Sequence, residues 1–302
     1  MTTPASAGAC LIVNADDYGY FDCVSKGILQ SASHGIVTAT GVFATAPHLP
    51  EHAVWLRDCD ALDVGVHLNL TDGSPLTNDM RKALSRWSGR FPGKFAVAMA
   101  IVSRAIGIDD VRLEWRAQIE RCLETGLRVR FLNSHEHVHM LPSLFPVASA
   151  LAGEYGIAHV RFPTSRFAWG SSGGSFLRSA IVKALETINR HRVAIPTAHF
   201  LGMETSGKLD VSYLERNIPR LCAGRIYELM CHPGQFDAQE VSDPRLRRYH
   251  DWEGELRTLT SSAVRELLQR HRVRLIGYRH VDIRDDRLVA REEAVEWPVP
   301  NR

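Results

Sequence analysis

The chain has 302 residues, of which 45% are hydrophobic and 23% charged, and its formal net charge at pH 7 is +2. This composition is typical of a globular protein, and the balanced charge argues against a nucleic-acid partner. The six cysteines are scattered without a CxxC pair, so we expect reduced thiols in a cytoplasmic protein. We find no signal-peptide pattern, and the apolar run at 95–102 is shorter than the ~20 residues of a membrane-spanning helix.

Short apolar runs alternate with helix-like stretches along the chain. Strands are predicted at 11–14, 36–44, 63–70, 129–133, 158–162, 197–201, 225–231 and 273–278. Helices are predicted at 22–34, 50–58, 111–125, 143–155, 175–191, 211–222 and 255–271. The alternation predicts an α/β fold with a parallel sheet that closes, or nearly closes, into a barrel, with a doubly wound open sheet as the alternative. Both architectures gather functional side chains at the carboxyl ends of the strands.

Two adjacent aspartates, Asp16 and Asp17, follow the first predicted strand in the stretch "LIVNADDYG". Aspartate is common in turns and helix caps, and this is the simpler interpretation of the pair. Strand alternation would direct the two side chains to opposite faces. We expect the backbone to turn at the strand end, so that both carboxylates reach one site.

Histidines lie at or near three other strand ends: His67 in "VGVHLNLTDG", a group of three in "NSHEHVHMLP", and His232 in "ELMCHPG". An extended backbone would place His135, His137 and His139 on one face and Glu136 on the other. One aspartate with two imidazoles suits a catalytic divalent cation and leaves positions for water and substrate. A neighbouring carboxylate can then act as general base. The alternative is a group of hydrogen-bonded or solvated loop histidines.

The blocks "NADDYG", "VGVHLNLTDG", "SHEHVHMLP" and "ELMCHPG" together resemble the signature of the YdjC/ChbG family of carbohydrate deacetylases, which includes the HpnK deacetylases. The resemblance implies one domain over 1–302, folded as a distorted (β/α) barrel of about seven to eight parallel strands related to polysaccharide deacetylases. It also implies a metal-dependent hydrolase that removes the acetyl group from an N-acetylated amino sugar. The implied metal ligands are Asp17, His67 and His135, with Asp16 as the base and His232 as the acid.

Further residues are candidates for substrate contacts or for support of the site. Each also has a simpler interpretation, as a turn former, a strand-end hydrogen bonder, a loop histidine or a surface charge. They are Asn14, Asn69, Thr71, His137, His139 and Arg161. Aromatic residues that line a sugar subsite, or simply belong to the core, are Tyr18, Tyr20, Phe21, Phe167 and Trp169. The apolar segment 91–108 is a lid, an approach for a lipid-linked sugar, or an ordinary packed helix.

Several points stay open at this stage. The cofactor is one divalent ion, either zinc or magnesium. The acetylated substrate is an oligosaccharide, a glycolipid or a nucleotide sugar, and membrane contact is expected only for a lipid-linked sugar. The oligomeric state is not predicted. Two other functions remain as alternatives: a barrel hydrolase or isomerase of another metal-dependent class, and a non-catalytic sugar- or metal-binding protein.

Overall fold

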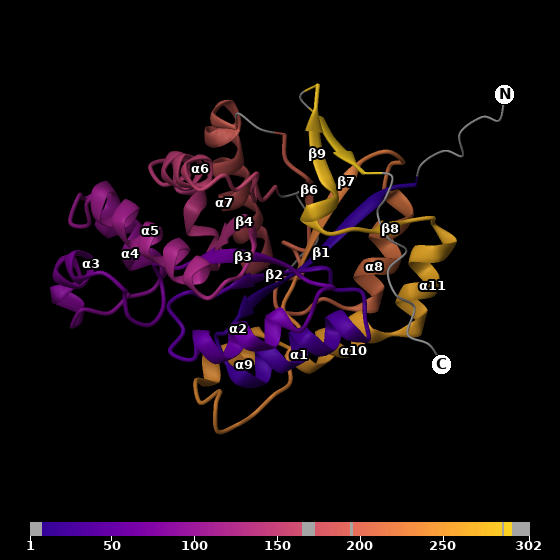
Figure 1. Cartoon of the computed structure of the whole chain (residues 1–302), viewed down its shortest axis with the longest axis horizontal. Helices are drawn as coiled ribbons and strands as arrows, with labels where there is room; N and C mark the ends of the chain where they lie inside the picture. The colour runs from indigo at the N-terminus through magenta and orange to yellow at the C-terminus, as the bar shows by residue number, and fades with distance from the viewer. Residues whose placement is uncertain (1–7, 165–172, 194–195, 286, 292–302) are drawn as a thin grey trace.

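A computed structural model describes residues 8–164, 173–193, 196–285 and 287–291 (Figure 1). Eight parallel strands form one sheet, with helices between most of them, so the predicted α/β architecture is confirmed. The strands are β1 (Cys10–Tyr18), β2 (Ala39–Val42), β3 (Asp63–Leu68), β4 (Val129–Ser134), β5 (His159–Val160), β6 (His199–Leu201), β7 (Ile226–Cys231) and β8 (Arg274–Leu275).

The strand order is β5-β4-β3-β2-β1-β7-β6, and β8 pairs with the start of β1. Strand β1 is central because it pairs with β7 over Cys10–Ala15 and with β2 toward its carboxyl end. Within the described residues no pairing joins β5 to β6. The barrel is therefore incompletely closed, which agrees with the expected distortion.

The helices confirm most of the predicted ranges and add several short ones. They are α1 (Asp22–Ser33), α2 (Leu49–Arg57), α3 (Asn78–Ala83), α4 (Lys94–Val102), α5 (Ile108–Glu124), α6 (Phe145–Glu154), α7 (Gly173–Asn189), α8 (Val211–Asn217), α9 (Pro244–Tyr249), α10 (Trp252–Thr260) and α11 (Ser262–Arg270). The helix predicted over 255–271 is wrong as one element. It divides at Ser261, whose hydroxyl accepts a hydrogen bond from the Ala263 amide and so begins a new helix.

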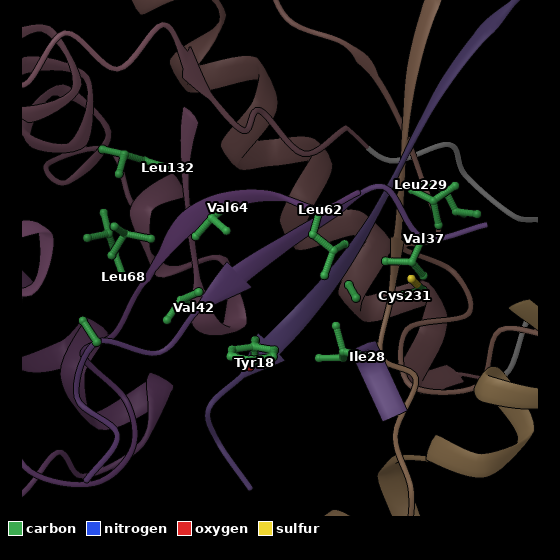
Figure 2. Close-up of a cluster of buried hydrophobic side chains, with 14 of the residues drawn as sticks. Tyr18, Ile28, Val37, Val42, Leu62, Val64, Leu68, Leu132, Leu229 and Cys231 are labelled. Carbon is green, nitrogen blue, oxygen red and sulfur yellow. The ribbon is translucent and has the colours of Figure 1, made fainter. Parts of the chain in front are cut away.

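Alternate residues of the sheet pack into two separate cores. Leu11 and Val13 of β1 point into the larger core between the sheet and the helices. Figure 2 shows part of this core, where Ile28 of α1 lies with Val42, Val64 and other side chains of the sheet. Cys10 and Ile12 point to the other face, into a smaller cluster that includes Phe131 and Tyr278. The second cluster lies on the face of the sheet opposite the larger core. The carboxyl end of β1 continues past both cores and carries residues of the site described below.

Short elements complete the chain and carry part of the site. They are the 3-10 turns η1 (Ser85–Trp87), η2 (His135–Met140), η3 (Arg190–Arg192), η4 (Ile218–Arg220) and η5 (Tyr278–His280), and an antiparallel hairpin of β9 (Val281–Arg284) and β10 (Arg287–Ala290). No helix in the described ranges has the length and apolar character needed to cross a membrane.

Candidate active site

A bulge in β1 brings the two adjacent aspartates to the same site. The pairing of β1 with β2 shifts between Ala15 and Tyr18, so that Asp16 and Asp17 lie opposite the single residue Gly41. Asp17 has a φ of 71°, in the left-handed region. Such a bulge redirects side chains within a strand. The strand therefore continues through the aspartates instead of ending before them. The bulge, and not a turn after the strand, reorients the two side chains.

Asp17, His67 and His135 converge at the carboxyl ends of β1, β3 and β4. Asp17 Oδ1 lies 3.1 Å from His67 Nε2 and 2.9 Å from His135 Nδ1. One ligand atom from each residue lies within 4.8 Å of the other two, and no other group of three such side chains lies this close together in the described residues. The side chains of Asp17 and His67 are buried, whereas that of His135 is 15% exposed. The arrangement is a cluster of one carboxylate and two imidazoles that solvent reaches at His135.

Asn133 holds the His67 ring in place. Its Oδ1 lies 2.8 Å from His67 Nδ1, and the carboxamide oxygen can only accept, so Nδ1 carries a proton and Nε2 is the atom that would bind a cation. Gly41 makes this contact possible. A Cβ at position 41 would lie 2.8 Å from Asn133 Oδ1, closer than real Cβ contacts allow, and 3.1 Å from His67 Nδ1, closer than most of them.

Aromatic rings form the wall beside the imidazoles. The Phe43 ring lies 4.8 Å from the His135 ring and 5.2 Å from the His67 ring, centre to centre. Tyr20 stacks on Phe43 at 5.0 Å and lies 5.7 Å from His135. This wall keeps water from one side of the pocket, which strengthens electrostatic interactions there.

Asp16 lies in a different setting, fully surrounded by hydrogen-bond donors. Arg161 binds both of its oxygens, with Nη1 2.6 Å from Oδ2 and Nη2 2.9 Å from Oδ1. Asn14 Nδ2 and Asn133 Nδ2 each donate to Oδ1 at 2.9 Å. Burial by itself raises the pKa of Asp16, but the Arg161 guanidinium holds it below its ordinary value. Asp16 is therefore ionised at neutral pH.

Arg161 links Asp16 to a second buried carboxylate. Its Nε donates to Glu228 Oε1 at 2.6 Å, and the arginine side chain has no exposed surface. Burial raises the pKa of Glu228, and Arg161 opposes this. The interpretation of Arg161 as a surface charge is therefore wrong. Its guanidinium forms ion pairs with two buried carboxylates, so Arg161 holds Asp16 in place from within the protein.

His232 follows β7 and lies buried near both aspartates. Its backbone amide donates to Glu255, and its Nδ1 has no hydrogen-bond partner in the described part of the chain. Burial lowers the pKa of His232, and the negative charges of Asp17 and Asp16 oppose this effect. The ring caps no backbone group through Nδ1, which weakens the interpretation of His232 as a strand cap.

A second histidine, His250, lies beside His232 and was not predicted. The two ring centres are 5.1 Å apart, and His250 stacks on Trp252 at 4.8 Å with an interplanar angle of 11°. Burial lowers the pKa of His250 to about 3, so this ring is neutral. Trp252 also contacts Phe21 edge-on at 6.5 Å. These rings form an aromatic surface next to His232.

The segment after β4 is not extended, so the predicted alternation of its histidines is wrong. Glu136 and His137 have φ values of 52° and 56°, and η2 turns immediately after Ser134. Glu136 still points away from the cluster, because its Oε1 pairs with Lys94 Nζ at 2.7 Å. His137 is T-shaped to Phe200 at 5.9 Å, and its buried Nδ1 has no partner in the described ranges. The turn separates the three imidazoles instead of aligning them.

The remaining candidates mostly hold the loops of the site. His139 is fully buried and uses both ring nitrogens, Nδ1 with the Ser134 hydroxyl and Nε2 with the Arg161 carbonyl. Asn69 accepts from the amides of Thr71 and Asp72 and donates to the Asp72 carbonyl, which organises the loop after β3. The Thr71 hydroxyl is buried and has no partner in the described residues.

The candidate aromatic residues divide between the core and the site. Tyr18 belongs to the larger core and donates to the His52 carbonyl at 2.8 Å. Tyr20 and Phe21 lie beside the site through their contacts with His135 and Trp252. Phe167 and Trp169 fall outside the described residues.

Sequence reasoning missed several residues that build the site. The ends of strands gave one usable signal, since Asn133 ends "VRFLN" as Asn14 ends "LIVN". The others carry no local signal, because their roles arise from partners far away in sequence: Gly41, Phe43, Glu228, His250 and Glu255.

A family model described as "YdjC-like protein" matches residues 10–270, which includes every element of this site. The chain belongs to the YdjC-like family. It is similar to a carbohydrate deacetylase of Geobacillus stearothermophilus, with 31% identity over 89% of this chain and 96% of the relative. It is also 31% identical to a chitooligosaccharide deacetylase of Escherichia fergusonii, over 89% of this chain and 97% of the relative.

A solved structure supports the fold of this YdjC-like chain. A protein of Enterococcus faecalis V583, described as a proposed cellobiose-phosphate cleavage protein, superimposes with a TM-score of 0.68 and 26% identity. The match covers 91% of this chain and 98% of that protein. The incompletely closed barrel is therefore an arrangement that a second chain also adopts over its whole length.

Proposed function

We propose that this YdjC-like chain is a metal-dependent carbohydrate N-deacetylase that removes the acetyl group from an N-acetylated amino sugar. The observation that carries the proposal is the division of the two adjacent carboxylates between two tasks. Asp17 lies with two imidazoles in an arrangement that can hold a cation, whereas the adjacent Asp16 is ionised and paired with Arg161. The similarity to named carbohydrate deacetylases over about nine tenths of the chain supports this reaction.

The donor set of Asp17, His67 and His135 fits a catalytic divalent cation. Three protein ligands leave coordination positions for water and substrate, and two imidazoles favour zinc over magnesium, which prefers oxygen. A bound ion would lower the pKa of a water molecule and polarise the acetamide carbonyl. The Asn133 contact that fixes the His67 tautomer is the kind of support that metal-binding histidines need.

Asp16 is the proposed general base. Its Oδ1 accepts three hydrogen bonds, whereas in the described residues Oδ2 accepts only from Arg161 Nη1. Oδ2 therefore keeps a lone pair for the proton of the attacking water. Arg161 holds the carboxylate in one orientation, so the base does not need to reorganise during the reaction.

His232 is the proposed general acid toward the departing sugar amine. An amine leaves poorly unless it is protonated, so a proton donor is needed on the leaving-group side. A lowered pKa makes protonated His232 a stronger acid, although it reduces the protonated fraction at neutral pH. His250, partly exposed and stacked on the buried Trp252, is the aromatic residue on this side that a sugar ring can contact.

Acetate release from N-acetylglucosamine oligomers tests the proposal directly. We expect release by the metal-loaded protein, loss of release with a chelator, and recovery when zinc is added back. A mass-spectrometric screen of acetylated oligosaccharides, glycolipids and nucleotide sugars for a loss of acetyl then identifies the substrate class. Metal binding with no loss of acetyl from any of these would contradict the deacetylase and favour a non-catalytic binding protein.

A further inference from the structure

One face of α4 exposes apolar side chains far more than any other described part of the molecule. Phe95 is 72% exposed, Met99 67% and Val102 76%, whereas no other large hydrophobic residue of the described chain exceeds 45%. Their spacing of four and three residues places them on one side of the helix. The opposite side, with Val97 and Ile101, is buried against the protein. Helix α4 is thus apolar on both faces but covered on only one, which marks an interaction surface.

The segment of chain that carries this exposed stripe is basic. Between residues 80 and 108 the chain contains no acidic residue. The basic residues of that segment are all exposed: Arg81, Lys82, Arg86, Arg90, Lys94 and Arg104. The segment therefore offers apolar groups for insertion and cations for attraction to negative charge.

We propose that the exposed stripe of α4, with the basic residues of 80–108, binds the surface of an anionic lipid bilayer. Phe95, Met99 and Val102 enter the interface between the headgroups, and the lysines and arginines bind the lipid phosphates. A helix of nine residues is only about 14 Å long, so it lies on the bilayer and does not cross it.

Charge also disfavours a second copy of the chain as the occupant. A two-fold symmetric contact centred on α4 would bring the same acid-free segment of both copies together. Like charges in such a contact repel each other, whereas anionic headgroups neutralise them.

The surface lies next to the site. Lys94, the first residue of α4, pairs with Glu136, which directly follows His135. Docking on a bilayer would therefore place the open side of the site close to the lipid headgroups. The inference goes beyond the proposed reaction, since it concerns where the protein lies and not which bond it cleaves.

Vesicle flotation tests the proposal. We expect the wild-type chain to float with vesicles of phosphatidylcholine mixed with phosphatidylglycerol, to stay behind with pure phosphatidylcholine, and to be released by high salt. The triple variant Phe95→Ser/Met99→Ser/Val102→Ser should bind the mixed vesicles at least about tenfold more weakly. A matched control, Ile283→Ser/Val289→Ser, changes exposed apolar residues of the β9–β10 hairpin, which lies away from α4 in Figure 1, and should bind like wild type.

A charge-reversal variant guards against a folding defect in the serine variant. Arg86→Glu/Arg90→Glu keeps the stripe intact and should also lose binding to the mixed vesicles. Acetate release from soluble N-acetylglucosamine oligomers should be unchanged in the serine variant, so that a failure of the proposed reaction is seen separately. Equal flotation of wild type and serine variant, or no flotation of wild type, would overturn the proposal. A wild-type dimer that the serine variant converts to a monomer would instead assign the stripe to a second copy.

Discussion

Asp16 and Asp17 are neighbours on β1, yet their partners differ in kind. The oxygens of Asp16 accept hydrogen bonds from a guanidinium and two carboxamides, whose protons are permanent. Asp17 contacts only imidazole nitrogens among the described ion pairs, and these can give up their protons to bind a cation. The hydrogen-bond and ion-pair partners of a carboxylate, and not its residue type, therefore decide whether it suits binding a metal ion or accepting a proton.

A third buried carboxyl group, that of Glu255, has partners of another kind. Glu255 is as buried as the aspartates, but its partners are the backbone amides of His232 and Leu209, which carry no full positive charge. Burial raises the pKa of Glu255 to about 8, whereas the imidazole of His135 outweighs burial and holds the pKa of Asp17 well below its ordinary value. Glu255 is therefore largely protonated at pH 7 while both aspartates are charged.

The largest expected effect comes from removing the charge of Asp17, the carboxylate that contacts the two imidazoles. Asp17→Asn should abolish binding of the divalent ion and with it essentially all deacetylation, because one of three ligands loses its charge. Metal content by mass spectrometry and acetate release measure the two effects. Asp22→Asn, which changes a half-exposed aspartate paired with His52, is the control and should retain both. Full metal content in Asp17→Asn would remove Asp17 from the ligand set.

The same substitution at Asp16 should leave metal binding intact and reduce turnover. Asp16→Asn should keep the metal ion but lose about 10²–10⁴-fold in kcat, the usual contribution of a general base. An asparagine at position 16 preserves the shape but cannot take the water's proton. The measurement is metal content together with kcat on one N-acetylated substrate. If kcat stays near the wild-type value, another group must act as the base.

Asn133 hydrogen-bonds to His67, a candidate metal ligand, and to Asp16, the proposed base. Its loss should therefore reduce both metal affinity and turnover moderately. Asn133→Ala frees the His67 ring and removes one donor from Asp16. We expect metal affinity to fall about 10–100-fold, as for other partners of metal-binding histidines. Titration with zinc measures the affinity. Saturating metal should restore only part of the activity, since Asp16 remains less firmly held. An unchanged affinity would show that the His67 ring is held by its packing alone.

Glu255 gives the smallest effect, one of stability. The folded state keeps its proton up to about pH 8, whereas the unfolded chain releases it near the ordinary pKa. Between these values the folded state binds more protons, so this group's contribution to stability falls as the pH rises through about 8. Glu255→Gln cannot ionise, but its amide nitrogen cannot accept from one of the two backbone amides, so it should be less stable than wild type near pH 5 and lose less stability toward pH 9. Thermal melting at several pH values measures this, and parallel curves would contradict it.

The sequence allowed the strands and the main candidate residues to be placed, because their signals are local. Each predicted strand exists, and Asp17, His67 and His135 lie together as their positions at strand ends implied. The bulge at Asp17 and the turn through Glu136 could not be predicted. Both depend on positive φ values at residues other than glycine, which the surrounding structure must enforce.

The support of the site was equally inaccessible to local reasoning. Arg161 is separated from Asp16 by 145 residues and from Glu228 by 67. Strands β4, β3 and β2 lie between β5 and β1 in the sheet, so the curvature of the incompletely closed barrel brings the three side chains together. An isolated arginine in "VRFP" gives no sign that it is buried. The curvature of the sheet, which no local sequence pattern reveals, creates this ion-pair chain.

The central place of β1 also has a consequence for how the chain folds. Two of its partners, β7 on one side and β8 on the other, follow it by more than 200 residues, so β1 cannot complete its pairing until almost all of the chain has been synthesised. The three candidate ligands all lie within the first 135 residues, whereas Arg161 and His232 come later. Such long-range pairing slows folding and leaves the edge of β1 open to wrong partners meanwhile. The emerging chain thus acquires the candidate ligands and Asp16 before Arg161, which holds Asp16, and before His232, the proposed acid, so the complete site forms only when the last strands arrive.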